Sequence, residues 1–375
     1  MNKVRLSKCS MSSLEKKAVM DVLDNEYLGM GIETQKFECA ISEYLNIKPE
    51  NIAAVSTGTS ALHLGLLAIG VLPGDEILVP SLTYVASFQA ISACGAIPIA
   101  CEVNPNTLFI DAEDARSKVT EKTKAIMPVH YASSSKGIDS IYELAHEFNL
   151  RVIEDAAQAF GCKSSQTKVG SSGDVICFSF DGIKNITCGE GGAVIAFDGT
   201  TIDKIKDMRL LGVKKDTEQR YAGKRSWDFD VELQGFRYHM SNINAAIGIQ
   251  QLSRIDEFSK KRQEIAKRYV DELSILNENV RVLDFNYNEI IPHIFVIKVT
   301  DRDLLREHLI SKGIECGVHY KPNHLLEKYR QSSNLVTTEL IYSEVLSIPC
   351  HVDLTEDEQS YVISEIKSFY HEKKD

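Results

Sequence analysis

The sequence predicts an α/β protein with a mostly parallel, doubly wound sheet, followed by a smaller C-terminal α+β domain. From residue 52 to about residue 197, short apolar runs alternate with helical patterns, which is typical of parallel strands joined by crossover helices. A long helical pattern then covers residues 242–268. A chain of 375 residues is too long for one compact core. We therefore expect a large domain over residues 1–250 and a small one over residues 251–375.

The elements follow in order along the chain. Ser12 and Glu15 have the spacing of a capping box, which predicts a helix to about residue 24, and a second helix is expected over residues 33–45. Seven strands are expected in the large domain, over residues 52–55, 77–80, 97–101, 124–129, 151–154, 175–180 and 193–197. In the small domain we expect strands over residues 294–299 and 314–319, and helices over residues 301–311 and 355–370. Residues 214–227 are polar and aperiodic, which indicates a mobile loop.

Two segments near the middle of the chain carry residues suited to cofactor chemistry. Ser179 lies at the end of an apolar run, five residues before Lys184, and Asp155 ends the apolar run upstream. A lysine amine can hold an aldehyde cofactor, a hydroxyl can bind its phosphate, and a carboxylate can pair with a pyridinium nitrogen. This combination indicates pyridoxal 5'-phosphate chemistry. Taken singly, each residue has a plainer explanation, such as a solvated lysine or an acid that binds magnesium or caps a helix.

A third segment, the small-residue turn at residues 56–60, opens directly into an apolar helical pattern. The start of a helix exposes unpaired N–H groups and the positive end of the helix dipole, so it favours a phosphate. The alternative is that Thr57 to Ser60 only cap the helix. By itself this turn favours capping. Its order with the two other segments in one β/α pattern favours a phosphate site.

Composition and charge exclude several other classes of protein. The net charge of −11 offers no basic field to nucleic acid or to an anionic membrane. There is no run of about eighteen apolar residues and no apolar signal-peptide core. Nine cysteines without a C-x-x-C pair favour reduced thiols, so we expect a cytoplasmic protein. His319 and His324 lie five residues apart across Pro322 and not on one helical face, so no metal site is expected.

Taken in order, these segments resemble the DegT/DnrJ/EryC1/StrS family of sugar aminotransferases, within fold type I of the pyridoxal phosphate enzymes. The resemblance runs from about residue 6 into the C-terminal region. Its most specific stretches are residues 56–64, 79–87, 128–131, 152–158, 175–192 and 235–248. It implies a large domain with a mostly parallel seven-stranded sheet between helices, a homodimer with shared active sites, and pyridoxal 5'-phosphate as the cofactor.

The resemblance also implies a role for individual residues. Lys184 would hold the cofactor and then move the proton between substrate carbon and cofactor, and Asp155 would pair with the ring nitrogen. Gln158 would hydrogen-bond the ring hydroxyl, and Tyr84 would stack on the ring. The phosphate ligands implied are Thr59, Ser60 and Ser179.

Residues 235–242 depart from the common family pattern. Many members have an asparagine that reaches the phosphate of the neighbouring subunit, and this chain has Arg237 at that position. Where those members have an arginine, this chain has His239. An arginine serves a phosphate as well as an asparagine or better. We therefore expect Arg237 and His239 at a cofactor site shared between subunits.

The substrate expectation rests on three local resemblances. Residues 129–132 and 184–188 resemble the branch of the family that makes 4-amino sugars. Residues 317–324 resemble the strand and loop that reach the sugar, so His319, Tyr320 and His324 are candidate substrate contacts; a strand end and a surface loop are an equally good explanation of them. The resemblance implies transfer from L-glutamate to a nucleotide-linked 4-keto-6-deoxyhexose, for bacterial O-antigen, capsule or other glycans.

Three alternatives stay open at this point. A 3-keto sugar aminotransferase is the nearest of them. A sugar dehydratase of the same fold carries a histidine where this chain has Lys184, which argues against that activity. A non-catalytic cofactor-binding regulator has no need of a lysine that bonds the cofactor.

Overall fold

The computed structural model describes residues 3–164, 167–224, 227–330 and 334–372. Its large sheet has the strand order β1-β9-β8-β5-β4-β2-β3. The strands are β1 (Ile52–Val55), β2 (Glu76–Pro80), β3 (Ile97–Cys101), β4 (Thr123–Ile126), β5 (Arg151–Asp155), β8 (Val175–Ser179) and β9 (Gly192–Ala196). Strand β9 is antiparallel to both of its neighbours, and the other neighbouring pairs are parallel. The seven predicted strands and their mostly parallel arrangement are confirmed.

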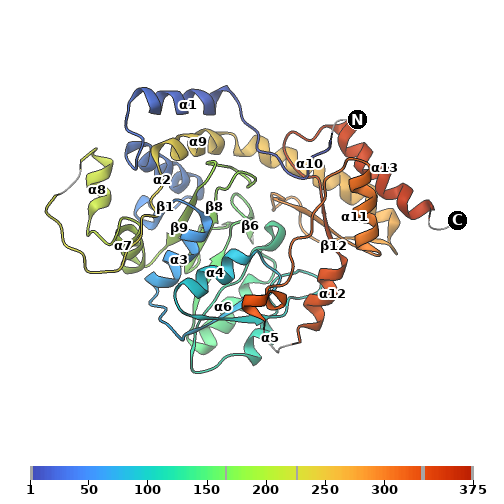
Figure 1. Ribbon diagram of the computed structural model, residues 1–375, viewed down its shortest axis with the longest axis horizontal. Helices are drawn as coiled ribbons and strands as arrows, with labels where there is room; N and C mark the ends of the chain where they lie inside the picture. The colour runs from blue at the N-terminus through green and yellow to red at the C-terminus, as the bar shows by residue number, and fades with distance from the viewer. Residues whose placement is uncertain (1–2, 165–166, 225–226, 331–333, 373–375) are drawn as a thin grey trace.

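Helices cover both faces of this sheet, because side chains of a strand alternate between its faces. Ala53 and Val55 of β1 join one apolar core, whereas Ile52 and Ala54 join another. The first face carries α3 (Gly58–Ala68), α4 (Val85–Ala93) and α7 (Gly199–Met208). The second face carries α2 (Ile32–Leu45), α5 (Ala112–Ser117), α6 (Ile138–Phe148) and α9 (Asn242–Ser253). Helix α1 (Ser13–Asp24), which begins with the predicted capping box, lies along α9 (Figure 1).

The long helix expected over residues 242–268 is two helices. Helix α9 ends at Ser253, and α10 (Ile255–Leu273) begins after Arg254, whose backbone leaves the helical region. The Arg254 guanidinium donates to Glu15 of α1 and to Glu257. Helix α9 packs in the core under the large sheet, whereas α10 begins in that same core and continues into the core under the small sheet.

The second sheet is antiparallel and has the order β10-β11-β12. Its strands are β10 (Val280–Val282), β11 (Phe295–Val299) and β12 (Val345–Ile348), and it packs against α10, α11 (Arg302–Ser311) and α13 (Glu356–Glu372). The prediction of a strand over residues 314–319 was wrong. Ile314 and Gly317 form only isolated bridges, and the third strand is β12, which follows α12 (Val336–Glu344) without a turn. The domain boundary near residue 250 stays a prediction.

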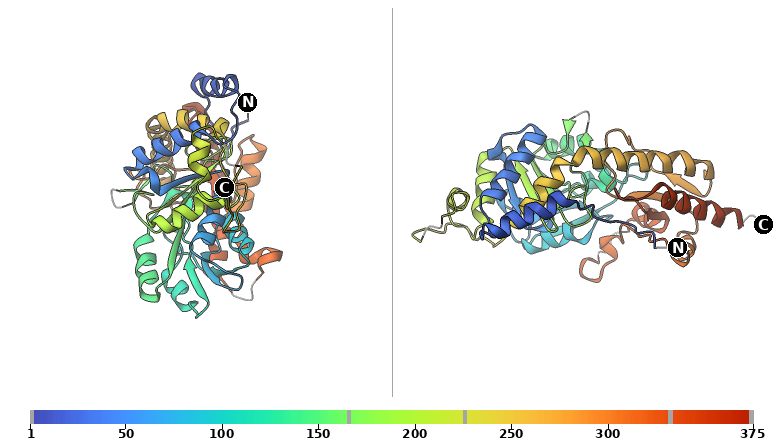
Figure 2. Two further views of the ribbon diagram at one scale, coloured as in Figure 1. Left: turned by 90° about the vertical axis from the view of Figure 1, so that its left-hand side faces the viewer. Right: turned by 90° about the horizontal axis from the view of Figure 1, so that it is seen from above.

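The expected loop over residues 214–227 contains a short helix, α8 (Asp216–Tyr221); residues 225–226 of it lie outside the described part. Figure 2 shows α8 extending from one end of the molecule, opposite the two termini. A buried ion pair holds it in place. Arg209 donates to Glu38 at 2.5 Å and to the Tyr221 hydroxyl at 3.0 Å, and the Tyr221 hydroxyl donates to Glu38. Within the described residues, no helix is long and apolar enough to cross a membrane.

Candidate active site

The carboxyl ends of β1, β2, β5 and β8 open on one cavity of about 420 Å³. Open α/β sheets bind their ligands at this edge. The lining residues used below are Thr57, Gly58, Thr59, Tyr84, Asp155, Gln158, Ser179, Asp181, Lys184, Glu190, His293, His319 and Tyr320. The fold therefore brings most of the predicted site residues together, although they lie far apart in the sequence.

Lys184 follows β8 and is half-buried in the cavity. Its Nζ lies 3.4 Å from Nε2 of His293. Burial lowers the pKa of the amine, and the charges of Asp155 and Asp181 oppose that effect. A lowered pKa leaves more of the amine uncharged near neutral pH, which is the form that attacks an aldehyde.

Asp155 is buried at the end of β5, and both of its carboxylate oxygens are held. The Ser87 hydroxyl, on α4, donates to Oδ2 at 2.7 Å. The backbone N–H of Ala157 donates to Oδ1 at 3.2 Å. These donors fix the direction of the carboxylate, as an acceptor for a cationic ring nitrogen requires.

The start of α3 forms a cradle against Ser179. A Cβ at Gly58 would lie 2.7 Å from Cβ of Ser179, so only glycine allows this close approach. The N–H groups of Gly58 and Thr59 have no hydrogen-bond partner among the described residues. The Ser60 hydroxyl, predicted to bind the phosphate, is instead part of the cap: it donates to the Thr57 carbonyl at 2.8 Å and does not line the cavity. Capping thus explains Ser60.

Gln158, Tyr320 and Tyr84 form one wall of the cavity. The amide of Gln158 is fixed at both ends: Oε1 accepts from the Ala132 N–H at 2.9 Å, and Nε2 donates to the Tyr320 hydroxyl at 3.1 Å. The Tyr84 ring is 59% exposed and its centroid lies 5.7 Å from that of Tyr320. The Tyr84 ring therefore lines the cavity with more than half of its surface exposed.

The two predicted histidines of residues 317–324 lie in different surroundings. His319 lines the cavity, and its Nδ1 is 2.7 Å from the Ser347 hydroxyl. Burial and the neighbouring Lys184 lower the pKa of His319 to about 4. His324 does not line the cavity: its ring nitrogens contact Ser81 at 2.7 Å and Glu339 at 3.1 Å. It fastens its loop to the segment after β2 and is not placed to touch a ligand in the cavity.

Arg237 and His239 do not line the cavity of their own chain. Isolated backbone bridges hold their segment against Leu210 and β1. Phe236 and Tyr238 stack on each other with centroids 5.0 Å apart, beside His63, and Arg237 between them is exposed. Burial, then the charge of Arg237 and of other arginines, lowers the pKa of His239 to about 4. The segment thus presents one exposed cation to the surroundings.

Sequence reasoning missed three of the residues at this cavity. His293 lies beside Lys184, and Asp181 and Glu190 add two carboxylates to the lining. The one available signal for His293 was a polar ring inside the apolar run of residues 290–297. Within the described ranges, no group of three or more His, Cys, Asp or Glu residues is arranged to hold a metal ion.

These residues fit pyridoxal 5'-phosphate. The cavity supplies a half-buried amine, a fixed carboxylate and an exposed aromatic ring, together with two N–H groups beside a serine hydroxyl that have no partner within the described ranges. Pyridoxal phosphate, when bound, supplies an aldehyde for the amine and an electron sink for the substrate. Fold and site together define a fold type I pyridoxal phosphate enzyme.

Comparison with known proteins narrows this class. A model of the DegT/DnrJ/EryC1/StrS aminotransferase family matches residues 10–367, so the chain belongs to that family. It is a pyridoxal phosphate-dependent sugar aminotransferase. Similar solved structures include the aminotransferase TlmJ from Streptoalloteichus hindustanus, which is 29% identical with a TM-score of 0.92, each chain being 99% covered.

Two further structures show the same likeness. The sugar aminotransferase CalS13 from Micromonospora echinospora is 29% identical, with 97% of this chain and 99% of that chain covered and a TM-score of 0.89. PseC from Helicobacter pylori is an aminotransferase involved in the biosynthesis of pseudoaminic acid. It is 26% identical, with 99% of this chain and 100% of that chain covered and a TM-score of 0.90. The likeness therefore extends over essentially the whole of each chain.

Proposed function

We propose that this enzyme moves an amino group from L-glutamate to C4 of a nucleotide-linked 4-keto-6-deoxyhexose, for a bacterial O-antigen, capsule or other glycan. The observation that carries the proposal is the single cavity in which the Lys184 amine lies with His319 and Tyr320, polar groups suited to sugar hydroxyls. The choice of C4 is supported by residues 129–132 and 184–188, which resemble the 4-amino-sugar branch of the family. PseC, a structural relative, is an aminotransferase involved in the biosynthesis of pseudoaminic acid.

In this proposal Lys184 holds the cofactor and then carries the proton at the substrate carbon in both half-reactions. Its lowered pKa suits both tasks, because only the uncharged amine can attack an aldehyde or accept a proton. Asp155 would pair with the ring nitrogen of the cofactor and Gln158 with its ring hydroxyl, while Tyr84 would lie against the ring face. The phosphate would be held by the N–H groups of Gly58 and Thr59, which have no partner in the described part of the chain, and by the Ser179 hydroxyl.

The proposed sugar contacts are the polar atoms of His319 and Tyr320 that are not already fully used in hydrogen bonds within the described part of the chain. The bond from His319 Nδ1 to Ser347 leaves Nε2 for a substrate hydroxyl, and the lowered pKa of His319 keeps the ring neutral. The Tyr320 hydroxyl accepts from Gln158 and keeps its own proton to donate. We propose these two residues as substrate contacts and assign His324 to holding the loop.

Charge balance supports a second copy of the chain at this site. Among the described residues that line the cavity, Asp155, Asp181 and Glu190 are acidic and Lys184 is the one lysine or arginine. Burial and the charge of Asp181 raise the pKa of Glu190. A phosphate, a nucleotide diphosphate and the carboxylates of glutamate all require cations. We propose an isologous homodimer in which the exposed Arg237 segment of one subunit reaches the cofactor phosphate of its partner.

A substrate panel tests the regiochemistry. The enzyme loaded with pyridoxal phosphate is given L-glutamate and, separately, nucleotide-linked 3-keto and 4-keto 6-deoxyhexoses, and the products are identified by nuclear magnetic resonance. We expect a 4-amino sugar that forms only when glutamate is supplied. Turnover confined to the 3-keto sugars would transfer the assignment to C3, and turnover of none of them would remove the sugar class proposed here.

Replacement of Asp155 by alanine should slow transamination by about 10² to 10³-fold while the cofactor stays bound through Lys184. Without the carboxylate, the ring nitrogen loses the partner that keeps it protonated, and the ring withdraws electrons less well. Single-turnover rates with glutamate measure the effect. Ser87→Ala is the matched control, because it removes one donor to Asp155 and leaves the carboxylate in place, so its loss should be much smaller. A rate for Asp155→Ala near that of the wild type removes Asp155 from this role.

A further inference from the structure

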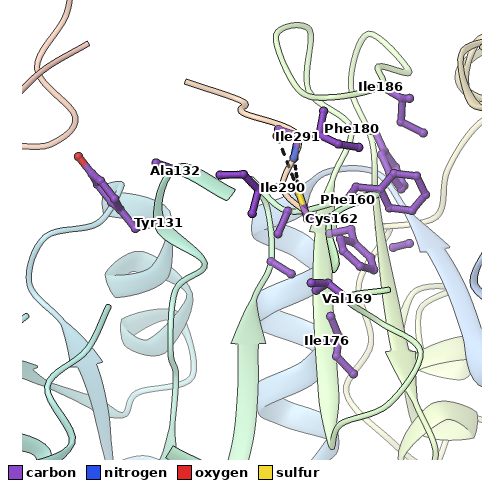
Figure 3. Close-up of a cluster of buried hydrophobic side chains, with 14 of the residues drawn as sticks. Tyr131, Ala132, Phe160, Cys162, Val169, Ile176, Phe180, Ile186, Ile290 and Ile291 are labelled. Atoms are coloured by element: carbon purple, nitrogen blue, oxygen red, sulfur yellow. Dashed lines mark hydrogen bonds between the residues drawn. The ribbon is translucent and has the colours of Figure 1, made fainter. Parts of the chain in front are cut away.

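His293 is held in a fixed position next to Lys184. Its backbone N–H donates to the Ser133 hydroxyl at 3.0 Å, and its carbonyl accepts from the buried Arg262 guanidinium at 3.3 Å. Ile291, two residues before His293, donates from its backbone N–H to Sγ of Cys162 at 3.2 Å, and Figure 3 shows this contact within a cluster of buried hydrophobic side chains. The imidazole is itself buried. Its Nε2 therefore stays 3.4 Å from Nζ of Lys184.

The surroundings of the ring decide which nitrogen carries the proton. Nδ1 of His293 is buried and has no hydrogen-bond partner among the described residues. A buried N–H without an acceptor is rarer and less favourable than a bare acceptor. We therefore assign the proton to Nε2, which lies 3.4 Å from Nζ of Lys184. In this tautomer Nε2 can donate to Lys184 but cannot accept from it.

The charges around the pair keep the ring neutral. Burial holds the pKa of His293 well below its usual value, and Lys184, Arg262 and His319 lower it further. On the other side, Asp155 and Asp181 favour the charged form of Lys184 and oppose its burial. Burial is the larger effect and lowers the pKa of Lys184, and a hydrogen bond donated to the amine would add to burial against these two carboxylates.

We propose that His293 is a positioning residue that keeps the Lys184 amine uncharged and turned toward the cavity, by donating from Nε2–H to the lone pair of Nζ. An uncharged amine can accept this hydrogen bond. An ammonium group has three donors and no acceptor, so it would place its N–H groups against the N–H of the ring. The inference rests on the proposed role of Lys184 as the residue that holds the cofactor and carries the proton.

The test measures the reactivity of the Lys184 amine itself, in the full-length protein freed of cofactor. Reductive methylation with formaldehyde is followed at several pH values by mass spectrometry, with the exposed Lys260 of the same chain as the reference. His293→Phe should lower the reactivity of Lys184 relative to Lys260 about tenfold near neutral pH, since more of the amine is then charged. His293→Gln should act in the same direction, because its amide can turn a carbonyl oxygen toward the ammonium.

Two controls separate this effect from a loss of structure. His351→Phe makes the same change at another buried histidine near Arg262, away from Lys184, and should leave the reactivity of Lys184 unchanged. The thiol of Cys162, which contacts the segment before His293, should stay protected from maleimide reagents in every variant. Protection of Cys162 shows that the buried cluster around it is intact.

An unchanged reactivity of Lys184 in His293→Phe and His293→Gln, with Cys162 protected, overturns the proposal. Exposure of Cys162 in both variants overturns it too, since the ring would then serve to hold the fold. The sugar panel is independent of this measurement. If the wild-type enzyme aminates none of the sugars but its Lys184 responds as expected, the proposed substrate fails and the role of His293 stands.

Discussion

Replacing Lys184 by alanine should abolish the yellow colour of the cofactor-bound enzyme and lower turnover by about 10³ to 10⁴-fold. Among the described residues that line the cavity, no other lysine amine is present to bond the cofactor or to carry the proton at the substrate carbon. The absorption spectrum after addition of pyridoxal phosphate and the rate of glutamate consumption measure the two losses.

Two comparisons make this result specific to the amine of Lys184. Lys184→Arg keeps a cation in the cavity but cannot bond the cofactor, so it should lose the colour and the turnover as well. Lys260→Ala removes an exposed lysine far from these residues in the sequence and should behave as the wild type. Glutamate turnover at an undiminished rate in Lys184→Ala would mean that another residue holds the cofactor.

The sequence could predict those site residues whose chemistry is visible in a short segment. Asp155, Ser179 and Lys184 each lie at or just after a strand that its apolar run marks clearly, and their order along the chain implies one edge of a parallel sheet. The seven strands were predictable for the same reason, since buried parallel strands read as continuous apolar runs bounded by turns.

Residues that act on a partner far away in the sequence but close in space were not predictable in this way. Ser87 matters because α4 places its hydroxyl 2.7 Å from Asp155, and His293 matters because its segment runs beside Lys184. Neither contact has a counterpart in local sequence. His319 and His324 show the reverse case: they look alike in the sequence, but the chain turns between them, and His324 faces Ser81 and Glu339 instead of the cavity.

The local sequence pattern also fails to predict helix and strand boundaries where tertiary contacts determine the backbone conformation. The helical pattern over residues 242–268 continues through Arg254, but the helix breaks there, and α10 runs from the core that it shares with α9 into the core under the small sheet. The short helix α8 has little apolar periodicity of its own and is held by Tyr221 against the Arg209–Glu38 ion pair. Strand β12 follows α12 directly, so no turn residue marks its start.

The second large effect is expected from mixing two inactive variants of the proposed homodimer. Lys184→Ala chains lack the cofactor lysine. Arg237→Glu chains should bind the cofactor weakly, because an acid would face the phosphate of the partner's site. Each variant alone should show almost no turnover. After reversible dissociation and mixing in equal amounts, about half of the dimers should be mixed, since pairing is random between identical interfaces.

In a mixed dimer the two defects meet at one site, and the other site has an intact Lys184 from one subunit and an intact arginine from the other. Each mixed dimer therefore has one working site, and roughly a quarter of the wild-type activity should return. Arg237→Gln is the matched variant: it removes the cation without adding a negative charge, so it should weaken cofactor binding less and show the same recovery when mixed. Differently tagged chains, purified through both tags in turn, establish that mixed dimers have formed.

The result distinguishes the two places where Arg237 could act. Its exposed position outside the cavity of its own chain is explained if it serves the neighbouring subunit, and the acid-rich lining then gains the cation that a phosphate needs. If purified mixed dimers show no recovery, Arg237 serves its own subunit or no active site. The negative charge of Glu190 and Asp181 at the cavity would then have to be balanced by another part of the chain.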